Sequence, residues 1–86
     1  MTAKGSGGLD PITKELVGVA AAVAGHCEPC FSYHYNEALN LGIPFDAIEA
    51  AVNMAGAVHR AGQKHMEEFA DRRMGKPARA VAKVAA

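Results

Sequence analysis

The two cysteines of this 86-residue chain lie three positions apart, and a histidine follows the second by four positions. If this stretch is helical, residues three and four apart share a face, so Cys27, Cys30 and His34 point the same way. Helical residues three apart have Cα atoms about 5 to 5.5 Å apart, which is within the range that a disulfide tolerates. Because a cross-link stabilises more as its loop grows longer, this short loop indicates redox or metal chemistry rather than a structural bridge.

The position of Cys30 favours its thiolate, which is the reactive form of cysteine. Proline is tolerated only in the first turn of a helix, so Pro29 predicts that a helix begins here, with Glu28 as its cap. A helix N-terminus and a neighbouring imidazolium both lower the pKa of a thiol from its ordinary value of about 8.5. His34, one turn further on, can take the thiol proton. Cys27, just before the helix, would close a disulfide once Cys30 has reacted.

Eleven residues separate Glu15 from Cys27, and Glu15 lies at the edge of an apolar helical stripe. In an antiparallel helix pair the second helix passes back over the first, and the helical rise places Glu15 about 15 Å and His34 about 9 Å from the turn. A tilted crossing or one bridging water would join the two side chains. The alternative is that the negative charge of Glu15 only stabilises its own helix, because it lies near the N-terminus of that helix. The spacing supports both interpretations of Glu15 equally.

A zinc site is the main alternative to redox chemistry. The pattern C-x2-C-x3-H supplies three ligands, and Glu15, His26 or a water would be the fourth. Zinc sites of this kind take a second ligand pair from a distant segment, and the sequence has none, so thiol chemistry is favoured and no metal or other cofactor is expected. A role for the cysteines as small buried apolar side chains is less favoured still. His59 is predicted to lie in a core or interface, and His26 and His65 are predicted to be peripheral.

The apolar spacing predicts an all-α domain of about four helices, because no alternating run of β-branched residues predicts a strand. The predicted helix boundaries all depend on a cap residue, a proline or a glycine: Asp10–Pro11 to Gly25, the cysteines to Leu41–Gly42, Ile43–Pro44 to about Gly62, and Gln63 to Met74. The predicted organisation is a flexible tail at residues 1–8, a helical domain at 9–75, and a C-terminal tail or short helix at 76–86.

The composition argues against several classes of function. The formal net charge is zero and no basic block occurs, so neither nucleic acid nor a membrane is an expected partner. The longest apolar run, Leu16 to Gly25, is too short for a bilayer that needs about 20 residues, and the first eight residues lack the apolar region of a signal peptide. We therefore expect a cytoplasmic protein. A single small domain in which half the residues are hydrophobic is expected to complete its core as a homo-oligomer.

The full pattern E-x11-C-x2-C-x3-H, followed by Leu41–Pro44 and Ile48–Val52, resembles the carboxymuconolactone decarboxylase family, and more closely its alkylhydroperoxidase D-type branch. The resemblance covers roughly residues 9 to 70. It implies an all-helical fold of the alkylhydroperoxidase D type, completed by assembly into trimers or hexamers. It also implies a redox-active cysteine pair that reduces peroxides or disulfides.

The same resemblance implies a role for each site residue. Cys30 would be the attacking thiolate, and Cys27 the resolving thiol that also exchanges with a thiol reductant, such as a reductant protein. Glu15 and His34 would form a proton relay to the thiols. Family members that decarboxylate lactones lack the cysteine pair, so that reaction is disfavoured here.

The sequence departs from the peroxidase type at one position. That type carries a histidine immediately before its second cysteine, whereas this chain has Pro29, which cannot relay protons, so that link of the peroxide chemistry is either missing or replaced by His26. The leading hypothesis is therefore a thiol-dependent oxidoreductase whose substrate, a peroxide or a disulfide, stays open. One alternative is a lyase of the decarboxylase type, whose activity would survive Cys-to-Ser changes at both positions. The other is a non-enzymatic zinc- or redox-sensing module, which would bind zinc and turn over no disulfide.

Overall fold

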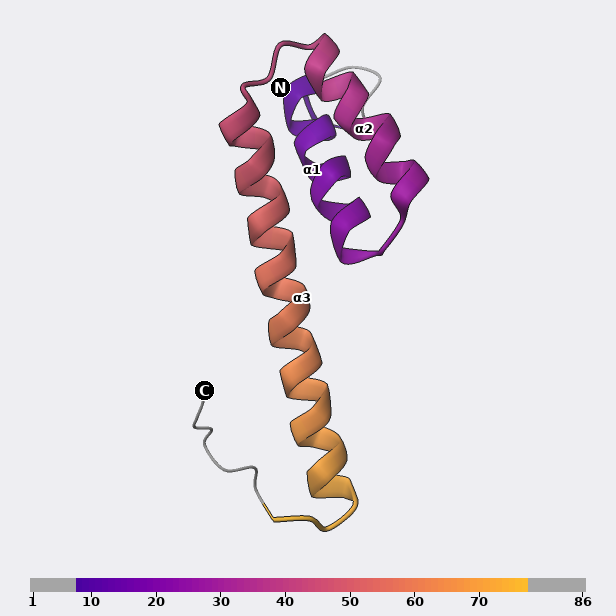
Figure 1. Ribbon diagram of the computed structural model, residues 1–86, viewed down its shortest axis with the longest axis vertical. Coiled ribbons are helices and arrows are strands. Elements are labelled where there is room, and N and C mark those ends of the chain that lie inside the picture. Colours follow the sequence, from indigo (N-terminus) through magenta and orange to yellow (C-terminus); the bar gives the residue numbers. More distant parts are fainter. Residues whose placement is uncertain (1–7, 78–86) are drawn as a thin grey trace.

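The computed structural model describes residues 8–77, and these form three α-helices and no strand. The helices are α1 (Pro11–Ala24), α2 (Glu28–Asn40) and α3 (Phe45–Arg73), shown in Figure 1. The all-α class is thus confirmed. The tails predicted at residues 1–8 and 76–86 lie almost entirely outside the described residues.

Helix α1 begins as its sequence predicts. The side chain of Asp10 caps it, because Oδ1 accepts a hydrogen bond from the Thr13 amide at 2.8 Å, and Pro11 is the first helical residue. The bonds from Thr13 to the carboxylate lower the pKa of Asp10 below its ordinary value. Gly25 is the C-cap, also as predicted.

Cys27 takes part both in the hydrogen bonding that follows the end of α1 and in the start of α2. After the C-cap, His26 adopts a left-handed backbone with φ of 55°, and the Cys27 amide donates back to the Ala22 carbonyl at 3.0 Å. This is the hydrogen bonding of a Schellman motif. Cys27 is then the N-cap of α2, so the prediction that Glu28 is the cap was wrong: Glu28 is the first helical residue. The sulfur of Cys27 accepts the amide hydrogen that a capping oxygen would otherwise accept.

Helices α1 and α2 form an antiparallel hairpin that lies beside the first half of α3 (Figure 1). Helix α1 packs against both other helices, whereas α2 and α3 contact each other much less. The core consists of buried apolar side chains from all three helices and the second turn: Val19, Ala38, Ile43 and Ile48. Leu16, Phe31, Tyr35 and Val52 pack around them. The core therefore holds α1 and α2 together at the level of the predicted site.

The two predicted C-terminal helices are one continuous helix, α3, so the count of about four helices was wrong for the described residues. Glycine in a helix costs only about 1 kcal/mol relative to alanine, so Gly56 and Gly62 weaken α3 without ending it. A hydrogen bond of 2.9 Å from Gln63 to Glu67 spans the predicted break. Helix α3 ends at Arg73, before Gly75 with its φ of 75°. Neither α3 nor any other helix of the described chain is long and apolar enough to cross a membrane.

Candidate active site

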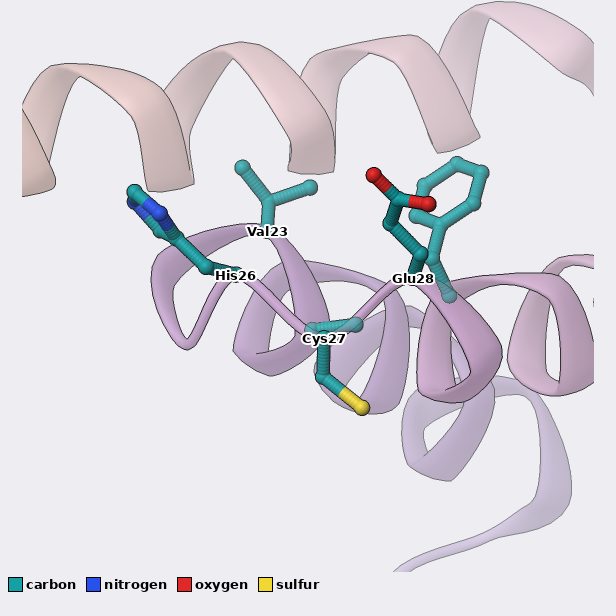
Figure 2. A pocket seen from close by; sticks show the side chains of 6 residues that line it. Val23, His26, Cys27 and Glu28 are labelled. Carbon is teal, nitrogen blue, oxygen red and sulfur yellow. The ribbon is translucent and has the colours of Figure 1, made fainter.

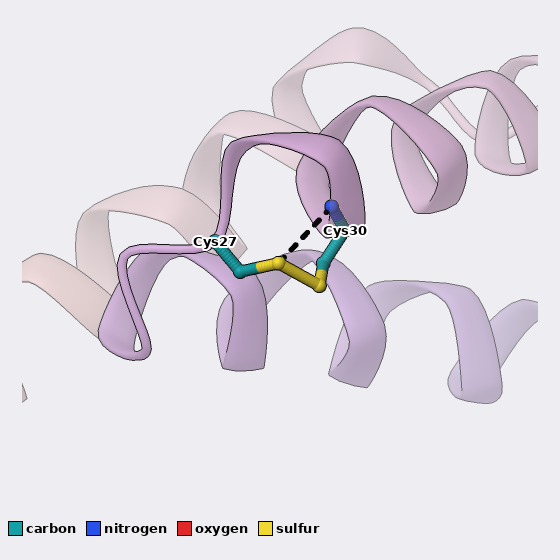
Figure 3. The surroundings of a disulfide bond; sticks show 2 residues. All are labelled: Cys27 and Cys30. Carbon is teal, nitrogen blue, oxygen red and sulfur yellow. Dashed lines mark hydrogen bonds between the residues drawn. A yellow bond between two sulfur atoms is a disulfide. The ribbon is translucent and has the colours of Figure 1, made fainter.

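Cys27 and Cys30 form a disulfide at the N-terminus of α2 (Figure 3). Their Cα atoms are 5.2 Å apart, as helical spacing predicts. The Cys30 amide donates a hydrogen bond to the Cys27 sulfur at 3.3 Å, drawn as the dashed line in Figure 3. Cys30 is exposed and Cys27 is partly buried. Cys30 is therefore the more exposed residue of the pair.

Glu15 and His34 meet directly, without a bridging water. The Nδ1 atom of His34 on α2 lies 2.6 Å from Oε1 of Glu15 on α1, although the two residues are nineteen positions apart in the sequence. Glu15 is only 4% exposed, and the ammonium group of Lys14 lies 3.4 Å from its second oxygen. Of the two interpretations of Glu15, the structure favours the contact with His34. The crossing of α1 and α2 removes the difference in height that the helical rise alone predicts.

This contact keeps Glu15 ionised and orients the His34 ring. The hydrogen bond to His34 is the largest cause that lowers the pKa of Glu15, and Lys14 lowers it further, whereas burial opposes the shift. Glu15 is therefore a carboxylate at neutral pH. A carboxylate beside Nδ1 favours the tautomer in which Nδ1 carries the hydrogen, which leaves Nε2 of His34 free to accept a proton. The His34 side chain is 26% exposed, so the imidazole is not closed off from solvent.

Sequence reasoning missed Gly18, which makes room for His34. A Cβ added to Gly18 would lie 2.5 Å from Cγ and 2.7 Å from Cε1 of the His34 ring, which is closer than real contacts allow. Gly18 lies three residues after Glu15, so the imidazole rests on the α1 backbone and reaches the carboxylate beside it. A glycine in the middle of an otherwise good helix often has such a packing reason, and that signal was present in the sequence.

A cavity of about 300 Å³ borders the same segment on the side that faces α3. Figure 2 shows the side chains of Val23, His26 and Glu28 pointing toward α3, whereas the sulfur of Cys27 points away from it. The disulfide and the cavity thus lie on different sides of the segment. The sulfur of Cys27 therefore faces away from this cavity, although Cys27 is one of its lining residues.

The histidine that lines this cavity, His26, is exposed as a peripheral residue would be, but its ring contacts α3. Nε2 of His26 lies 3.2 Å from Nε2 of His59 on α3. His59 was predicted to lie in a core or interface, but within its own chain it is exposed. His65 is exposed and lies 3.8 Å from Glu68, which agrees with its predicted peripheral place. In residues 8–77, no group of three or more histidine, cysteine or acidic side chains is arranged to hold a metal ion.

The four predicted site residues thus form two pairs, Cys27 with Cys30 and Glu15 with His34. Cys27 is bonded to Cys30, and His34 follows Cys30 by one turn and contacts Glu15. The cysteine pair at the start of α2 thus lies one helical turn from the imidazole that contacts Glu15. This arrangement is suited to dithiol–disulfide chemistry.

Comparison with known proteins agrees with this geometry. No curated protein and no solved structure gives a significant match. The model of the carboxymuconolactone decarboxylase family matches residues 1–71, which contain α1, α2, the cysteine pair and most of α3. The disulfide between Cys27 and Cys30 is consistent with the branch of that family that carries a cysteine pair. The chain therefore belongs to the carboxymuconolactone decarboxylase family.

Proposed function

We propose that this protein is a thiol-dependent oxidoreductase that reduces a disulfide substrate by oxidising Cys27 and Cys30. The observation that carries the proposal is the disulfide at the start of α2, one helical turn from an imidazole held by a buried carboxylate. A disulfide that closes so short a loop adds little stability, so its value to the protein lies in its chemistry. Membership in a family that includes enzymes supports a catalytic role.

The first step uses the exposed thiol of the reduced protein. Nε2 of His34 takes the proton of Cys30, and the carboxylate of Glu15 stabilises the imidazolium through Nδ1. The Cys30 thiolate then attacks one sulfur of the substrate disulfide. A bond forms between that sulfur and Cys30, the substrate S–S bond breaks, and the second substrate sulfur leaves as a thiolate that takes up a proton.

The second step closes the disulfide and releases the product. The sulfur of Cys27 attacks the sulfur of Cys30, and the first substrate sulfur leaves as a thiol. The substrate has then gained two electrons and two protons, and the cysteine pair has lost them. Two equivalents of a thiol reductant, or one dithiol, return the pair to the reduced state by the same exchange.

A disulfide fits this site better than a peroxide. In peroxide reduction the leaving group is an alkoxide or hydroxide, which is a far poorer leaving group than a thiolate and needs a proton during the step. Position 29, where the peroxidase type has a histidine, is a proline in the first turn of α2. Pro29 has neither an acidic side chain nor an amide hydrogen to give.

The test is the reaction of the reduced protein with oxidised lipoamide and, separately, with hydrogen peroxide, together with the reduction potential of the cysteine pair. We expect a reversible couple between about −120 and −270 mV, and faster reaction with the disulfide. In Cys27→Ser treated with a linear disulfide, whose second half leaves as a separate thiol, a covalent adduct should accumulate on Cys30, visible by mass spectrometry. Cys30→Ser should form no adduct and turn over no substrate. If the double Cys-to-Ser variant retains the activity, or the pair resists oxidation, the proposal is wrong.

We also propose that the protein works as a homo-oligomer, with the second half of α3 packed against other copies. Helix α1 is about 21 Å long and α3 about 43 Å, so much of α3 has neither of the other two described helices beside it (Figure 1). Met66 lies five helical turns after the buried Ile48 and so continues the packed face of α3. Met66 is 58% exposed and Phe69 48% exposed. A second copy presents the same apolar stripe, which makes the contact self-complementary.

Molar mass in solution tests this assembly. Wild-type protein should elute as a trimer, a hexamer or another multiple of the chain mass, and Phe69→Glu should shift it toward the monomer. Lys64→Glu, which places the same charge on a polar part of α3, should leave the mass unchanged. A wild-type monomer, or equal effects of both variants, would contradict the proposal.

A further inference from the structure

His26 and His59 place two imidazole nitrogens face to face across the gap between the α1–α2 turn and α3. Their Nε2 atoms are 3.2 Å apart, the ring centroids are 4.6 Å apart, and the rings are inclined by 49°. Both residues are exposed. The proposed redox cycle uses neither of them. The pair is also separate from Glu15 and His34, because it lies between α3 and the turn rather than between α1 and α2.

The backbone of His26 shows that a histidine at this position has a cost. Each of the three helices ends in the same Schellman hydrogen-bond pattern, and the residue after the C-cap has positive φ in all three. That residue is Gly42 after α2 and Gly75 after α3, but His26 after α1. A left-handed backbone costs a non-glycine residue about 1 kcal/mol or more. The fold therefore tolerates a modest backbone cost at the position that presents the His26 side chain to α3.

The spacing of the two nitrogens matches that of two ligands on one metal ion. Bonds of 2.0 to 2.1 Å at a tetrahedral angle place two ligand nitrogens about 3.3 Å apart, and a right angle places them about 2.9 Å apart. The observed 3.2 Å lies between these values. Imidazole nitrogens suit zinc, copper and nickel, and copper(II) binds such donors most tightly.

We propose that His26 and His59 bind a divalent transition-metal cation, of which Cu²⁺ and Zn²⁺ are the probes of choice. The two imidazoles occupy two coordination positions, and water fills the others. Because one ligand comes from the turn and the other from α3, the bound cation cross-links the segment that carries Cys27 to the long helix. The site is independent of the proposed redox function, since it needs no thiolate and exists while Cys27 and Cys30 are joined.

The experiment uses the full chain in its oxidised form, so that no free thiol competes for metal. Calorimetric titration with Cu²⁺ and Zn²⁺ gives the affinity, and the imidazole proton signals in the NMR spectrum report which histidines bind. The variants are His59→Ala and His26→Gly, with His65→Ala as the matched control on another exposed part of α3. His26→Gly removes the ligand and also gives the left-handed position the residue that it favours, so this variant should fold at least as well as the wild type.

We expect one site per chain, whose affinity falls about tenfold or more in His26→Gly and in His59→Ala and stays unchanged in His65→Ala. The signals of His26 and His59 should move on addition of Zn²⁺ at a metal-to-chain ratio of one, and those of His65 should not. Thermal unfolding of the wild type should shift upward with metal, and the shift should disappear in both ligand variants. Absence of binding, binding that survives both ligand variants, or equal loss in His65→Ala would each overturn the proposal.

Discussion

The two histidines that flank the cysteine pair meet very different surroundings. His34 faces α1, where its ring rests on Gly18 and contacts a carboxylate that is 4% exposed. His26 faces α3, where its ring meets the imidazole of His59 and both residues are exposed. The first contact is between opposite charges when His34 is protonated. The second contact is between two like groups, which repel when both are protonated.

Because of this difference, the side of the cysteine segment that faces α1 and the side that faces α3 are suited to different chemistry. A buried carboxylate orients an imidazole and stabilises its protonated form, which is what a proton acceptor beside a thiol needs. The Nε2 atoms of His26 and His59 share one hydrogen bond, in which one donates and the other accepts, and a change of tautomer in the donor frees both lone pairs for a metal cation. The segment from His26 to Cys30 thus has a proton-transfer partner on one side and a candidate ligand pair on the other. Variants on each side should affect different measurements.

The largest expected difference is between His34→Ala and His59→Ala in the reaction of reduced protein with a disulfide. Loss of His34 removes the acceptor for the Cys30 proton, so the rate at pH 7 should fall about 100-fold. His59→Ala should stay within about twofold of wild type, because His59 has no role in the proposed cycle. The loss in His34→Ala should shrink near pH 9, where solvent deprotonates the thiol without help. Stopped-flow rates across this pH range are the measurement, and equal losses in both variants would remove the distinction between the two sides.

The next effect concerns the position of the His34 ring. Gly18→Ala forces the imidazole away from α1, so we expect a loss of about 1 to 3 kcal/mol in the free energy of unfolding and a weaker contact with Glu15. Gly56→Ala is the matched control, because its added Cβ meets the flexible end of the Arg60 side chain, with Nη1 at 3.2 Å. That variant should be unchanged or about 1 kcal/mol more stable, as alanine favours the helix. Denaturant unfolding measures both, and a stable Gly18→Ala protein with full activity would show that the close contact does not matter.

The smallest effect is on stability in acid. The pKa of Glu15 is lower in the folded protein than its ordinary value of 4.5, chiefly through its hydrogen bond with His34. The carboxylate therefore contributes stability above pH 4.5, and this contribution is lost as the pH falls through the lowered pKa. Because the pKa of Asp10 is also lowered, the wild type and Glu15→Gln should both lose stability in acid, and the wild type should lose more. Denaturant unfolding from pH 6 to pH 3 measures the difference, which should vanish if Glu15 and His34 do not interact in solution.

Local features of the fold followed from the sequence, because they depend on neighbouring residues. Asp10 and Pro11 start α1, and the three-residue spacing of Cys27 and Cys30 brings their Cα atoms within disulfide reach. The end of α2 near Gly42 follows from the left-handed conformation that glycine adopts easily. The break predicted before Gln63 failed, because a helical glycine carries a small penalty that the continuing hydrogen bonds of α3 outweigh.

Contacts between helices were decided by the tertiary structure. The sequence placed Glu15 and His34 on neighbouring helices but at different heights, and only the crossing of α1 over α2, with Gly18 at the contact, brings them to 2.6 Å. The meeting of His26 with His59 depends on the left-handed turn at His26 and on where α3 passes that turn. By itself the sequence determined the class of fold and the cysteine pair, since spacing along one helix fixes distances over a few residues. The partners of that pair depend on how helices pack, which is set by the shape of the whole core.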